Sequence, residues 1–502
     1  MSSSQGRRTR VDDVSETDAG RLIGVLHGLT LDDLPPEVVI KAKDCLLDGL
    51  GCGLFGSEQP WSRILCEEMD ADGLAGACTV IGRTRPLPAP AAALCNGTAI
   101  HGFELDDLIA ESIVHPAAAV IPAALAAAEE CGASGGRVLL AIVAGYEIMH
   151  RVGLSLGDGP ARRGFHTTSL AAPIAATIAA GIVMGLPLAD LRSAIGLACS
   201  ASSGVKNFAA GHGGGMVKRL HLGRAAEAGV RMSRLAARQF TGPPNAIDGK
   251  MGLLEVFGGD TARPERLTHG LGRDWAVMDI WFKVYPICGW IQSVVQILSD
   301  LRGNRTFQAA DVEKVRVGVS AYAARNNGEP APLDTMGAQY SIPYCAALSL
   351  LGDPRDPTEY AKERVADADL RAVARKVEIH VDPAAEAVYP AKFAASVELS
   401  VAGAAPVLAR VDECRGTPAD PCSSDDLRAK FMLLASRRLA APEAQAIADD
   451  VARLERLPSI DPLARRLRAG PLAAGQAHMG APFTLLPSSA GEVSPSSATE
   501  GS

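Results

Sequence analysis

Between residues 89 and 200 the chain repeats one pattern, in which alanine-rich apolar stretches of helix length alternate with short Gly, Pro and Asp breaks. Apolar stretches of this length and spacing are typical of packed helices. Aromatic residues make up only 4% of the chain, and its many small residues allow neighbouring helices to approach closely. We therefore predict a helical bundle, with helices at Ala89–Leu105, Ala117–Cys131, Val138–Val152, Leu170–Met184 and Leu188–Ser200.

Two amphipathic helices are predicted nearer the N-terminus, at Arg21–Leu31 and Val38–Leu50. The second leads into Gly51-Cys52-Gly53-Leu54-Phe55-Gly56, which matches the dinucleotide motif G-x-G-x-x-G by letter. That motif requires a strand before it, whereas here a helix precedes it. We therefore interpret these glycines as helix-packing and turn residues.

The pattern changes from about residue 270, where valines and other apolar residues begin to alternate with polar ones. Period-two alternation predicts half-buried strands. A hairpin is indicated by Ala402-Gly403-Ala404-Ala405, and helices are expected at Gln339–Leu351 and Asp369–Arg375. The predicted strands are centred on Val315–Val319, Val377–Val381, Val397–Val401 and Val407–Val411.

These patterns divide the chain into five parts. The fold class is mainly α, with a large all-helical domain and a smaller α+β domain inserted into it. The C-terminal stretch 424–457 is helical again, and we expect it to return to the first body. The predicted parts are a flexible arm 1–17, a helical domain 18–270, an α+β domain 271–412, a returning helical segment 413–469 and a disordered tail 470–502.

Composition excludes several classes of function. The net charge is −8, and no Lys/Arg stripe indicates a nucleic-acid partner. The 11 cysteines lack a CxxC pair, which favours reduced intracellular thiols over a disulfide framework. The N-terminus lacks the apolar region of a secretory signal, and Leu170–Leu186 is too short and too weakly hydrophobic to cross a membrane. We expect a cytoplasmic protein with no membrane partner.

A first candidate for chemistry is the acidic stretch between residues 96 and 122. Glu104, Asp106 and Asp107 lie close together, and His115 stands just before an apolar run. Carboxylates and an imidazole beside a buried segment are how enzymes shift pKa values for proton transfer. A solvated turn that happens to contain a histidine would have the same sequence.

Two later stretches raise the odds of a site. His166 lies in a polar turn before an alanine-rich helix, which Thr168 or Ser169 would cap. A glycine-rich loop beginning at Gly211 runs into a helix that carries Lys218 and His221 three residues apart, on one face. A cation and free amides at a helix start suit a carboxylate. A surface cap and a solvated basic turn are the bland alternatives.

No sequence pattern indicates a metal or organic cofactor. HExxH, H-x-H and EF-hand patterns are absent from the sequence, and no strand–turn–helix elbow of the G-x-S-x-G type is indicated. Cys288 has no neighbouring base in the sequence, so a buried structural thiol is the simpler interpretation. A cofactor-free acid–base enzyme fits these features.

Taken together, the motifs resemble the MmgE/PrpD family, which contains 2-methylcitrate dehydratases, cis-aconitate decarboxylases and iminodisuccinate epimerases. The resemblance extends from about residue 20 to 465. It is carried by Leu46-Leu47-Asp48-Gly49-Leu50-Gly51, Asn96-Gly97-Thr98-Ala99, Glu104-Leu105-Asp106-Asp107 with His115, Gly164-Phe165-His166, Met216–Gly223, Lys283–Cys288 and Gln339–Tyr344.

The resemblance implies a homodimer, a site in the cleft between the two domains, and no metal or organic cofactor. Carried over by position, His115, His166, Lys218, Asp106 and Asp107 would be catalytic. Substrate-binding residues would be Glu104, His221, Cys288 and Tyr322. Cys288 and the acidic cluster with Ser112 look more like the fungal cis-aconitate decarboxylases than the animal ones, which have a histidine at position 288. Many members also have a histidine in place of Gln292.

The function expected from these residues is a metal-independent lyase that acts on a small di- or tricarboxylate. We rank decarboxylation or dehydration first and epimerisation of an iminodisuccinate-like dicarboxylate second. All three reactions use the same groups, so the sequence alone does not separate them. The alternative of another class is a non-catalytic carboxylate-binding relative. Gln292 favours this alternative, whereas the intact His115, His166 and Lys218 oppose it.

Overall fold

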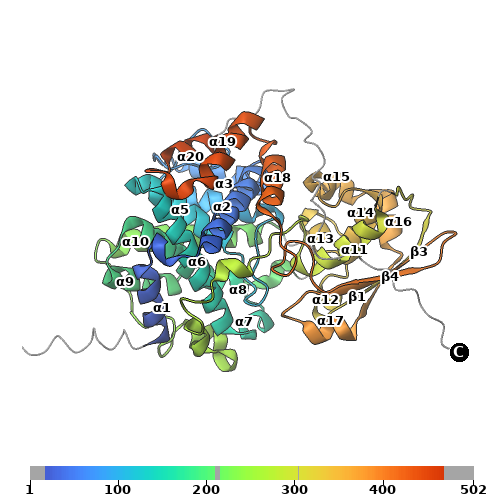
Figure 1. Ribbon diagram of the computed structural model, residues 1–502, viewed down its shortest axis with the longest axis horizontal. Coiled ribbons are helices and arrows are strands. Elements are labelled where there is room, and N and C mark those ends of the chain that lie inside the picture. Colours follow the sequence, from blue (N-terminus) through green and yellow to red (C-terminus); the bar gives the residue numbers. More distant parts are fainter. Residues whose placement is uncertain (1–16, 210–214, 304, 469–502) are drawn as a thin grey trace, which may run out of the picture.

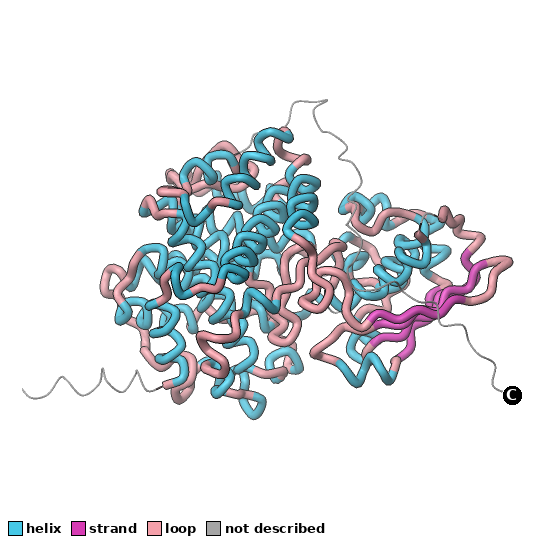
Figure 2. Tube along the Cα trace, viewed as in Figure 1, coloured by secondary structure: helices cyan, strands magenta, loops and turns pink. Residues whose placement is uncertain are grey.

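A computed structural model describes residues 17–209, 215–303 and 305–468. Helix accounts for 59% of the residues and strand for 7%, which confirms a mainly α fold with a small α+β part. Figure 1 shows a large helical body beside a smaller one, and Figure 2 shows that the strands are confined to the smaller body. Apart from residue 17, the predicted flexible arm lies outside the described residues, and so does the whole predicted disordered tail.

The large body is built from helices that follow the predicted order. The expected helix at Ala117–Cys131 is found with those same bounds, and the others differ by a few residues at their ends. The first ten helices are α1 Asp18–Gly28, α2 Pro36–Gly56, α3 Pro60–Ala71, α4 Ala89–Ile100, α5 Ala117–Cys131, α6 Gly135–Leu156, α7 Gly159–Arg162, α8 Thr167–Met184, α9 Leu188–Cys199 and α10 Val217–Ala236. Short helical turns between and after them include η3 His101–Phe103, η4 Lys206–Ala209, η5 Leu254–Gly258, η7 Pro264–Leu267 and η8 Ala276–Asp279.

Helix α8 is the centre of this body, because α5, α6, α9 and α10 all pack against it. By length and composition, α6 and α8 would each be able to cross a membrane, so the expectation that the stretch 170–186 is too short and too weakly hydrophobic is wrong. However, 89% of the apolar window of each is buried inside the protein. Both are therefore core helices, and their apolar character is explained by the bundle that surrounds them.

Small residues let α4 and α10 touch along their backbones. A Cβ added to Gly223 of α10 would lie 2.2 Å from Oγ1 of Thr98 and 2.4 Å from the main-chain oxygen of Leu94, both on α4. A Cβ added to Gly97 of α4 would lie 2.9 Å from Cα of Gly223. This approach matters for function because α4 leads into the predicted acidic stretch and the first turn of α10 carries Lys218.

The glycine-rich match at residues 51–56 lies in the last turns of α2, where every residue is buried. Gly51 packs against Phe431 of α18 (Ser424–Ala435), and a Cβ on Gly56 would collide with the main chain of Ala99. These glycines are helix-packing residues, as the sequence predicts, and do not form a nucleotide-binding loop.

The smaller body carries one four-stranded sheet in the order β2-β1-β3-β4. β1 pairs in parallel with β2 and antiparallel with β3, and β3 and β4 form the predicted hairpin around Gly403. Its strands and helices are α11 Gln292–Arg302, β1 Val312–Val319, α12 Ala321–Asn326, α13 Thr335–Gln339, α14 Ile342–Leu351, α15 Lys362–Val365, α16 Ala368–Ala374, β2 Val377–Val381, α17 Pro383–Val388, β3 Ala395–Val401 and β4 Val407–Val411.

Burial differs between the central and the edge strands. Val315, Val317 and Val319 of β1 are buried, as the alternation predicts. On the edge strands the alternation is weaker, since Val381 of β2 and Val407 of β4 are exposed. Helix α11 packs against β3 and β4, while α12 and α14 contact β2. The central pair β1–β3 contributes buried side chains to the core of the smaller body.

The C-terminal helices return to the large body, as expected from the sequence (Figure 1). They are α18 Ser424–Ala435, α19 Ala441–Ala452 and α20 Asp461–Arg466, and α18 packs along α2. Nζ of Lys430 lies 2.6 Å from Oδ1 of Asp48 in a buried ion pair, and it also donates to the main-chain oxygen of Leu105. The returning helix thereby supports the start of the acidic stretch. The exact domain boundaries stay predictions.

Candidate active site

A cavity lies where the acidic stretch, the start of α8, the start of α10 and residues 283–290 meet. Its empty volume, counted out to the open mouth, is about 600 Å³. The lining combines apolar side chains with a few ionisable ones. The polar members are Glu104, His115, His166, Thr167, Thr168, Lys206, Lys218, Lys283, Cys288 and Tyr340.

The acidic stretch forms a tight, buried loop after α4. Glu104 has a φ of 58° and Ile113 a φ of 53°, so two residues other than glycine adopt left-handed conformations in this loop. Such conformations cluster at functional sites, where surrounding contacts hold them. The loop is fixed by backbone bridges between Leu108 and Trp281 and between Ile109 and Val114. It turns Glu104 into the cavity, while Asp106 and Asp107 are fully buried behind the lining.

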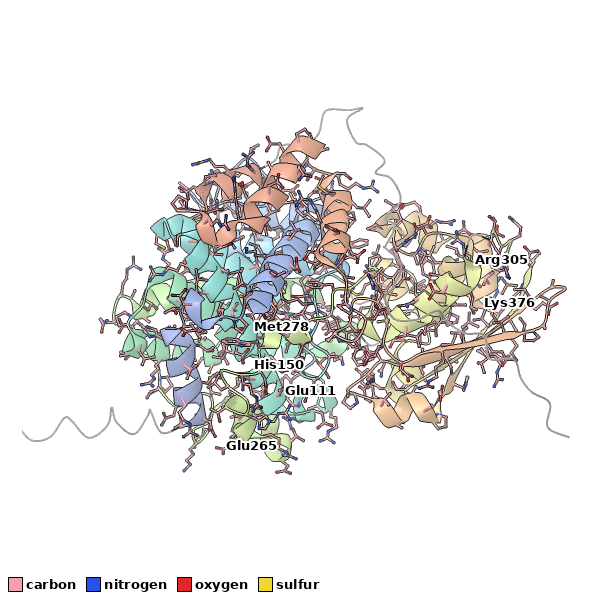
Figure 3. The ribbon with its side chains drawn as sticks, viewed as in Figure 1. Glu111, His150, Glu265, Met278, Arg305 and Lys376 are labelled. Carbon is pink, nitrogen blue, oxygen red and sulfur yellow. The ribbon has the colours of Figure 1, made fainter. Side chains whose placement is uncertain are left out.

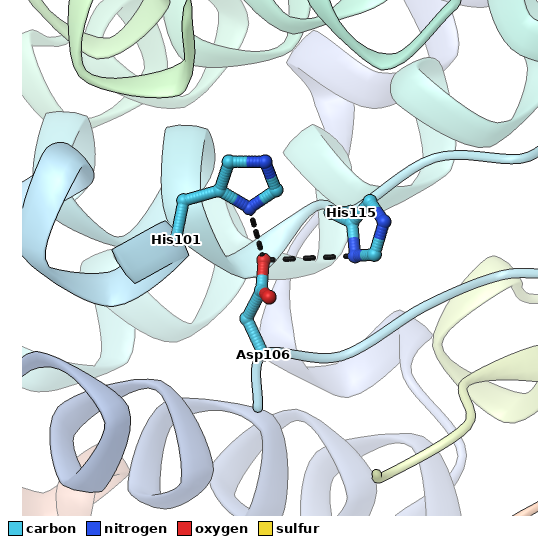
Figure 4. Close-up of side chains that lie close together, drawn as sticks. All are labelled: His101, Asp106 and His115. Carbon is cyan, nitrogen blue, oxygen red and sulfur yellow. Dashed lines mark hydrogen bonds and ion pairs between the residues drawn. The ribbon is translucent and has the colours of Figure 1, made fainter. Parts of the chain in front are cut away.

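Asp106 bridges two imidazoles (Figure 4). Its Oδ2 lies 2.6 Å from Nδ1 of His101 and 3.6 Å from Nδ1 of His115. Burial by itself would raise the pKa of Asp106, but the two histidines and the bond from His101 lower it overall. Asp106 is therefore an ionised carboxylate that orients imidazoles.

His101, Asp106 and His115 are also close enough together to invite comparison with a metal site. Tetrahedral zinc ligands at bond lengths near 2.1 Å stand about 3.3 Å apart. The 2.6 Å between His101 and Asp106 is a hydrogen-bond distance, and Nδ1 of His115 is already bound to a main-chain oxygen. The cluster is therefore arranged as a hydrogen-bond network.

His115 has a defined tautomer. Its Nδ1 lies 2.7 Å from the main-chain oxygen of Asp107, and a carbonyl oxygen only accepts, so Nδ1 carries the hydrogen. Burial lowers the pKa of His115 to about 3, although Asp106 opposes the shift. The neutral ring keeps a lone pair on Nε2, which has no hydrogen-bond partner among the described residues. His115 lines the cavity as a neutral ring with an unprotonated Nε2.

Asp107 holds the loop rather than facing the cavity. Tyr146 of α6 donates to its Oδ2 over 2.7 Å, and the main-chain NH of Ala117, at the start of α5, donates to its Oδ1. Burial raises the pKa of Asp107 to about 8. These contacts suit a residue that positions His115 through its own main-chain oxygen.

His166 is paired with a second histidine. It precedes the first residue of α8, and its Nδ1 lies 3.2 Å from Nδ1 of His221 on α10. Burial and the nearby Lys218 lower the pKa of His166, and burial lowers that of His221 to about 4. One ring must donate and the other accept. Neither Thr168 nor Ser169 caps α8, because the helix begins one turn earlier than that prediction required.

Glu104 is shared by two buried lysines. It forms ion pairs with Lys218, in the first turn of α10, and with Nζ of Lys283 at 3.3 Å. Burial would raise the pKa of Glu104, but the two ammonium groups hold it well below its usual range. Burial lowers the pKa of Lys218, whereas Glu104 and Asp106 raise that of Lys283 overall. The glycines at positions 211–214 before α10 lie outside the described residues.

A third lysine reaches the cavity without a carboxylate partner among the described residues. Lys206, in η4, donates to the hydroxyl of Tyr322 and stands over the rings of Trp290 and Tyr322. Tyr322 itself does not line the cavity. Cys288 does, and burial followed by the negative charge of Glu104 raises the pKa of its thiol to about 11, so it is neutral.

Gln292 has a structural role. Its side-chain NH2 donates to the main-chain oxygens of Tyr285 and Ile287, and its Oε1 accepts from the NH of Tyr285. It shapes the turn that carries Cys288 and does not line the cavity. The departure from the histidine of other members therefore leaves the groups that face the cavity unchanged.

The structure brings together most of the predicted site residues. Glu104, His115, His166, Lys218 and Cys288 line one cavity, with Asp106, Asp107 and His221 directly behind them. Sequence reasoning missed His101, Lys206 and Lys283. Lys283 stands within a quoted motif and His101 lies between two of them, whereas no motif surrounds Lys206. His150, labelled in Figure 3, is a buried histidine bonded to Ser112 and is not part of the lining.

Comparison with known proteins identifies the family of the chain. The model of the MmgE/PrpD N-terminal domain matches residues 20–265, and that of the C-terminal domain matches residues 285–456. The chain belongs to the MmgE/PrpD family. The two matches together cover most of this MmgE/PrpD chain and include every cavity residue named above except Lys283, which lies just between them.

Curated relatives of this MmgE/PrpD protein are lyases. It is 28% identical to a cis-aconitate decarboxylase of Aspergillus terreus, over 87% of this chain and 92% of the relative. It is 32% identical to the cis-aconitate decarboxylase-like protein oryM of Aspergillus oryzae, over 64% and 70%. It is 25% identical to a 2-methylcitrate dehydratase of Salmonella typhimurium, over 69% and 74%. The chain is accordingly a carbon–carbon or carbon–oxygen lyase of this family.

Proposed function

We propose that this protein is a metal-independent lyase that acts on a small di- or tricarboxylate, by decarboxylation as in the cis-aconitate decarboxylases or by dehydration as in the 2-methylcitrate dehydratases. The observation that carries the proposal is the combination of neutral imidazoles with surplus positive charge in one cavity. Among the described lining residues, Lys206, Lys218 and Lys283 face a single carboxylate, Glu104. Such a cavity attracts a polyanion.

The lysines would hold substrate carboxylates and stabilise charge that develops on the neighbouring carbon. Lys218 and Lys283 are oriented by Glu104, so their ammonium groups need little rearrangement when a substrate arrives. The low exposure of this group, about 2% for each residue, strengthens electrostatic contacts by excluding water.

The imidazoles would move the protons. His115 presents a lone pair on Nε2 and would act as the acceptor. If His221 donates to Nδ1 of His166, then Nε2 of His166 carries a hydrogen and acts as the donor. His221 is only half-buried, so it can take up a proton from solvent and pass it to His166.

The same groups serve each reaction in the family. In a decarboxylation, the C–C bond to one carboxylate breaks, CO2 leaves, and His166 protonates the carbanion that remains. In a dehydration, His115 removes a C–H proton while His166 protonates the departing hydroxyl, which leaves as water. Epimerisation of an iminodisuccinate-like dicarboxylate is the second candidate, because two proton-transfer groups face one cavity.

Proton NMR of the purified protein in D2O with EDTA tests the proposal. The substrates are cis-aconitate, 2-methylcitrate, citrate and iminodisuccinate. Loss of a carboxylate, or an alkene formed from a hydroxy acid, is the expected result. Deuterium exchange at a C–H without net breakdown would replace the lyase proposal with epimerisation. Carboxylate binding without any turnover would favour the non-catalytic relative.

We further propose a cytoplasmic homodimer that needs no metal or organic cofactor, with neither nucleic acid nor membrane as partner. The support is the family resemblance, the acidic net charge of −8 and the burial of both apolar helices. Sedimentation of the purified protein tests the dimer, and full turnover in EDTA tests the independence from metal.

A further inference from the structure

Lys206 differs from the other two lysines of the cavity in its surroundings. Lys218 and Lys283 are buried and share the carboxylate of Glu104. Lys206 is half-buried, lines the same cavity and forms no ion pair with a carboxylate among the described residues. Its ammonium group contacts only a neutral phenol and two aromatic faces.

The position of Lys206 is nevertheless well defined. Its main-chain NH donates to the oxygen of Gly164 over 2.7 Å, next to a backbone bridge between Phe165 and Val205. Its side chain crosses from the helical body to the smaller body, where the hydroxyl of Tyr322 accepts from Nζ. The rings of Trp290 and Tyr322 lie 5.4 Å and 5.0 Å from Nζ, and such contacts favour a cation. A fixed ammonium group without a counterion in the described part of the chain is thus held at the cavity wall.

A partly buried ammonium group gains most from an anion that arrives with the ligand, because its desolvation is then compensated. The carboxylate of Glu104 is already paired with Lys218 and Lys283, so it does not act as a counterion for Lys206. A substrate with several carboxylates can place one against Lys218 and Lys283 and another against Lys206. The separation of these two positions would then select the acids that fit.

We propose that Lys206 binds one carboxylate of the substrate and makes the cavity selective for acids that carry a carboxylate at that position. This rests on the proposed function only for the class of ligand, a small polycarboxylate. Lys206 is a binding residue here and takes no part in proton transfer. Tyr322, which holds its ammonium group from the smaller body, is the positioning residue.

Isothermal titration with three matched acids tests the proposal. Tricarballylate has three carboxylates, glutarate lacks its central carboxylate, and methylsuccinate lacks one terminal carboxylate. Lys206→Met should weaken tricarballylate about ten- to a hundredfold, as expected for loss of a charged hydrogen bond. The same substitution should weaken the binding of one of the two diacids, the one that lacks the carboxylate bound by Lys206, by less than about threefold.

Three further variants serve as controls. Lys206→Arg keeps the charge and should restore most of the affinity, while Tyr322→Phe should weaken tricarballylate less than Lys206→Met does. Lys314→Met removes an exposed lysine that pairs with Glu378 on the sheet and should change nothing. A wild-type melting temperature for Lys206→Met confirms that the variant is folded.

The proposal is overturned if Lys206→Met binds tricarballylate like the wild type, if the wild type does not bind it, or if all three acids weaken by the same factor. The last result would indicate a general field effect rather than a contact. Failure of the lyase proposal is distinguishable, because it appears as absence of turnover in NMR whereas the Lys206 contact is measured by binding alone.

Discussion

Nδ1 of His115 lies 2.7 Å from the main-chain oxygen of Asp107, and this contact fixes which nitrogen of His115 remains free. Because the oxygen accepts, the hydrogen is on Nδ1 and the lone pair is on Nε2. The sequence brings the two residues within eight positions of each other, but the direction of the bond depends on the buried loop between α4 and α5.

Two substitutions of His115 test the roles of its two ring nitrogens independently. His115→Asn keeps a donor near the position of Nδ1, and His115→Gln places an amide near Nε2. Neither supplies a base, so turnover of the substrate identified by NMR should fall about 10²- to 10⁴-fold in both. His115→Asn should keep the wild-type melting temperature, because the bond to Asp107 is retained. Substantial turnover in His115→Asn would exclude His115 as the proton acceptor.

Asp107→Asn tests the raised pKa of a buried carboxyl group. The pKa of Asp107 rises from 3.8 to about 8 on burial, so the folded protein keeps a proton that the unfolded chain has lost. Its contribution to the free energy of unfolding is therefore full below about pH 4 and declines by about 1.4 kcal/mol per pH unit up to about pH 8. The asparagine variant lacks this decline.

Urea unfolding between pH 5.5 and 7.5 measures the effect. The stability of Asp107→Asn relative to wild type should increase by about 2 to 3 kcal/mol over this range. A difference that does not change with pH would mean that Asp107 is ionised in the folded protein. Asp449→Asn, an exposed carboxylate paired with Arg428, is the matched control.

Glu104→Gln removes the carboxylate that two buried lysines share. Lys218 and Lys283 would be left as neighbouring buried cations, and loss of one partner from a buried pair costs about 3 to 5 kcal/mol. Urea unfolding at neutral pH should show a loss of this size. Glu378→Gln breaks an exposed pair with Lys314 and should cost less than about 1 kcal/mol. Equal losses in the two variants would contradict the role of Glu104.

Gly223→Ala tests the contact between α4 and α10. The added Cβ would lie 2.2 Å from Oγ1 of Thr98, so the helices must separate, at a cost of about 1 to 3 kcal/mol or more. Turnover should fall as well, since the two helices carry the loop of Glu104 and the ammonium of Lys218. Gly28→Ala, at the end of α1 with no atom within 4 Å of its Cβ, is the control. A lower melting temperature for Gly28→Ala than for Gly223→Ala would refute the close contact.

The sequence by itself determined the secondary structure, the mainly α fold and the family. Apolar periodicity is a local property, so α5 and the four strands could be predicted from neighbouring residues alone. Ordered motifs likewise identified His115, His166 and Lys218, because each stands in a stretch that resembles the family.

Only the tertiary structure decided which of these groups meet and in what state. Glu104 is 114 residues from Lys218 and 179 from Lys283, and no local pattern encodes their shared ion pair. Burial lowers the pKa of His115 and raises that of Asp107, and so favours the neutral form of both. The helices that bury these two residues are distant in sequence. No sequence motif surrounds Lys206. The carboxylate-binding role proposed for it follows from its position in the cavity, where it reaches from the helical body to Tyr322 of the smaller body.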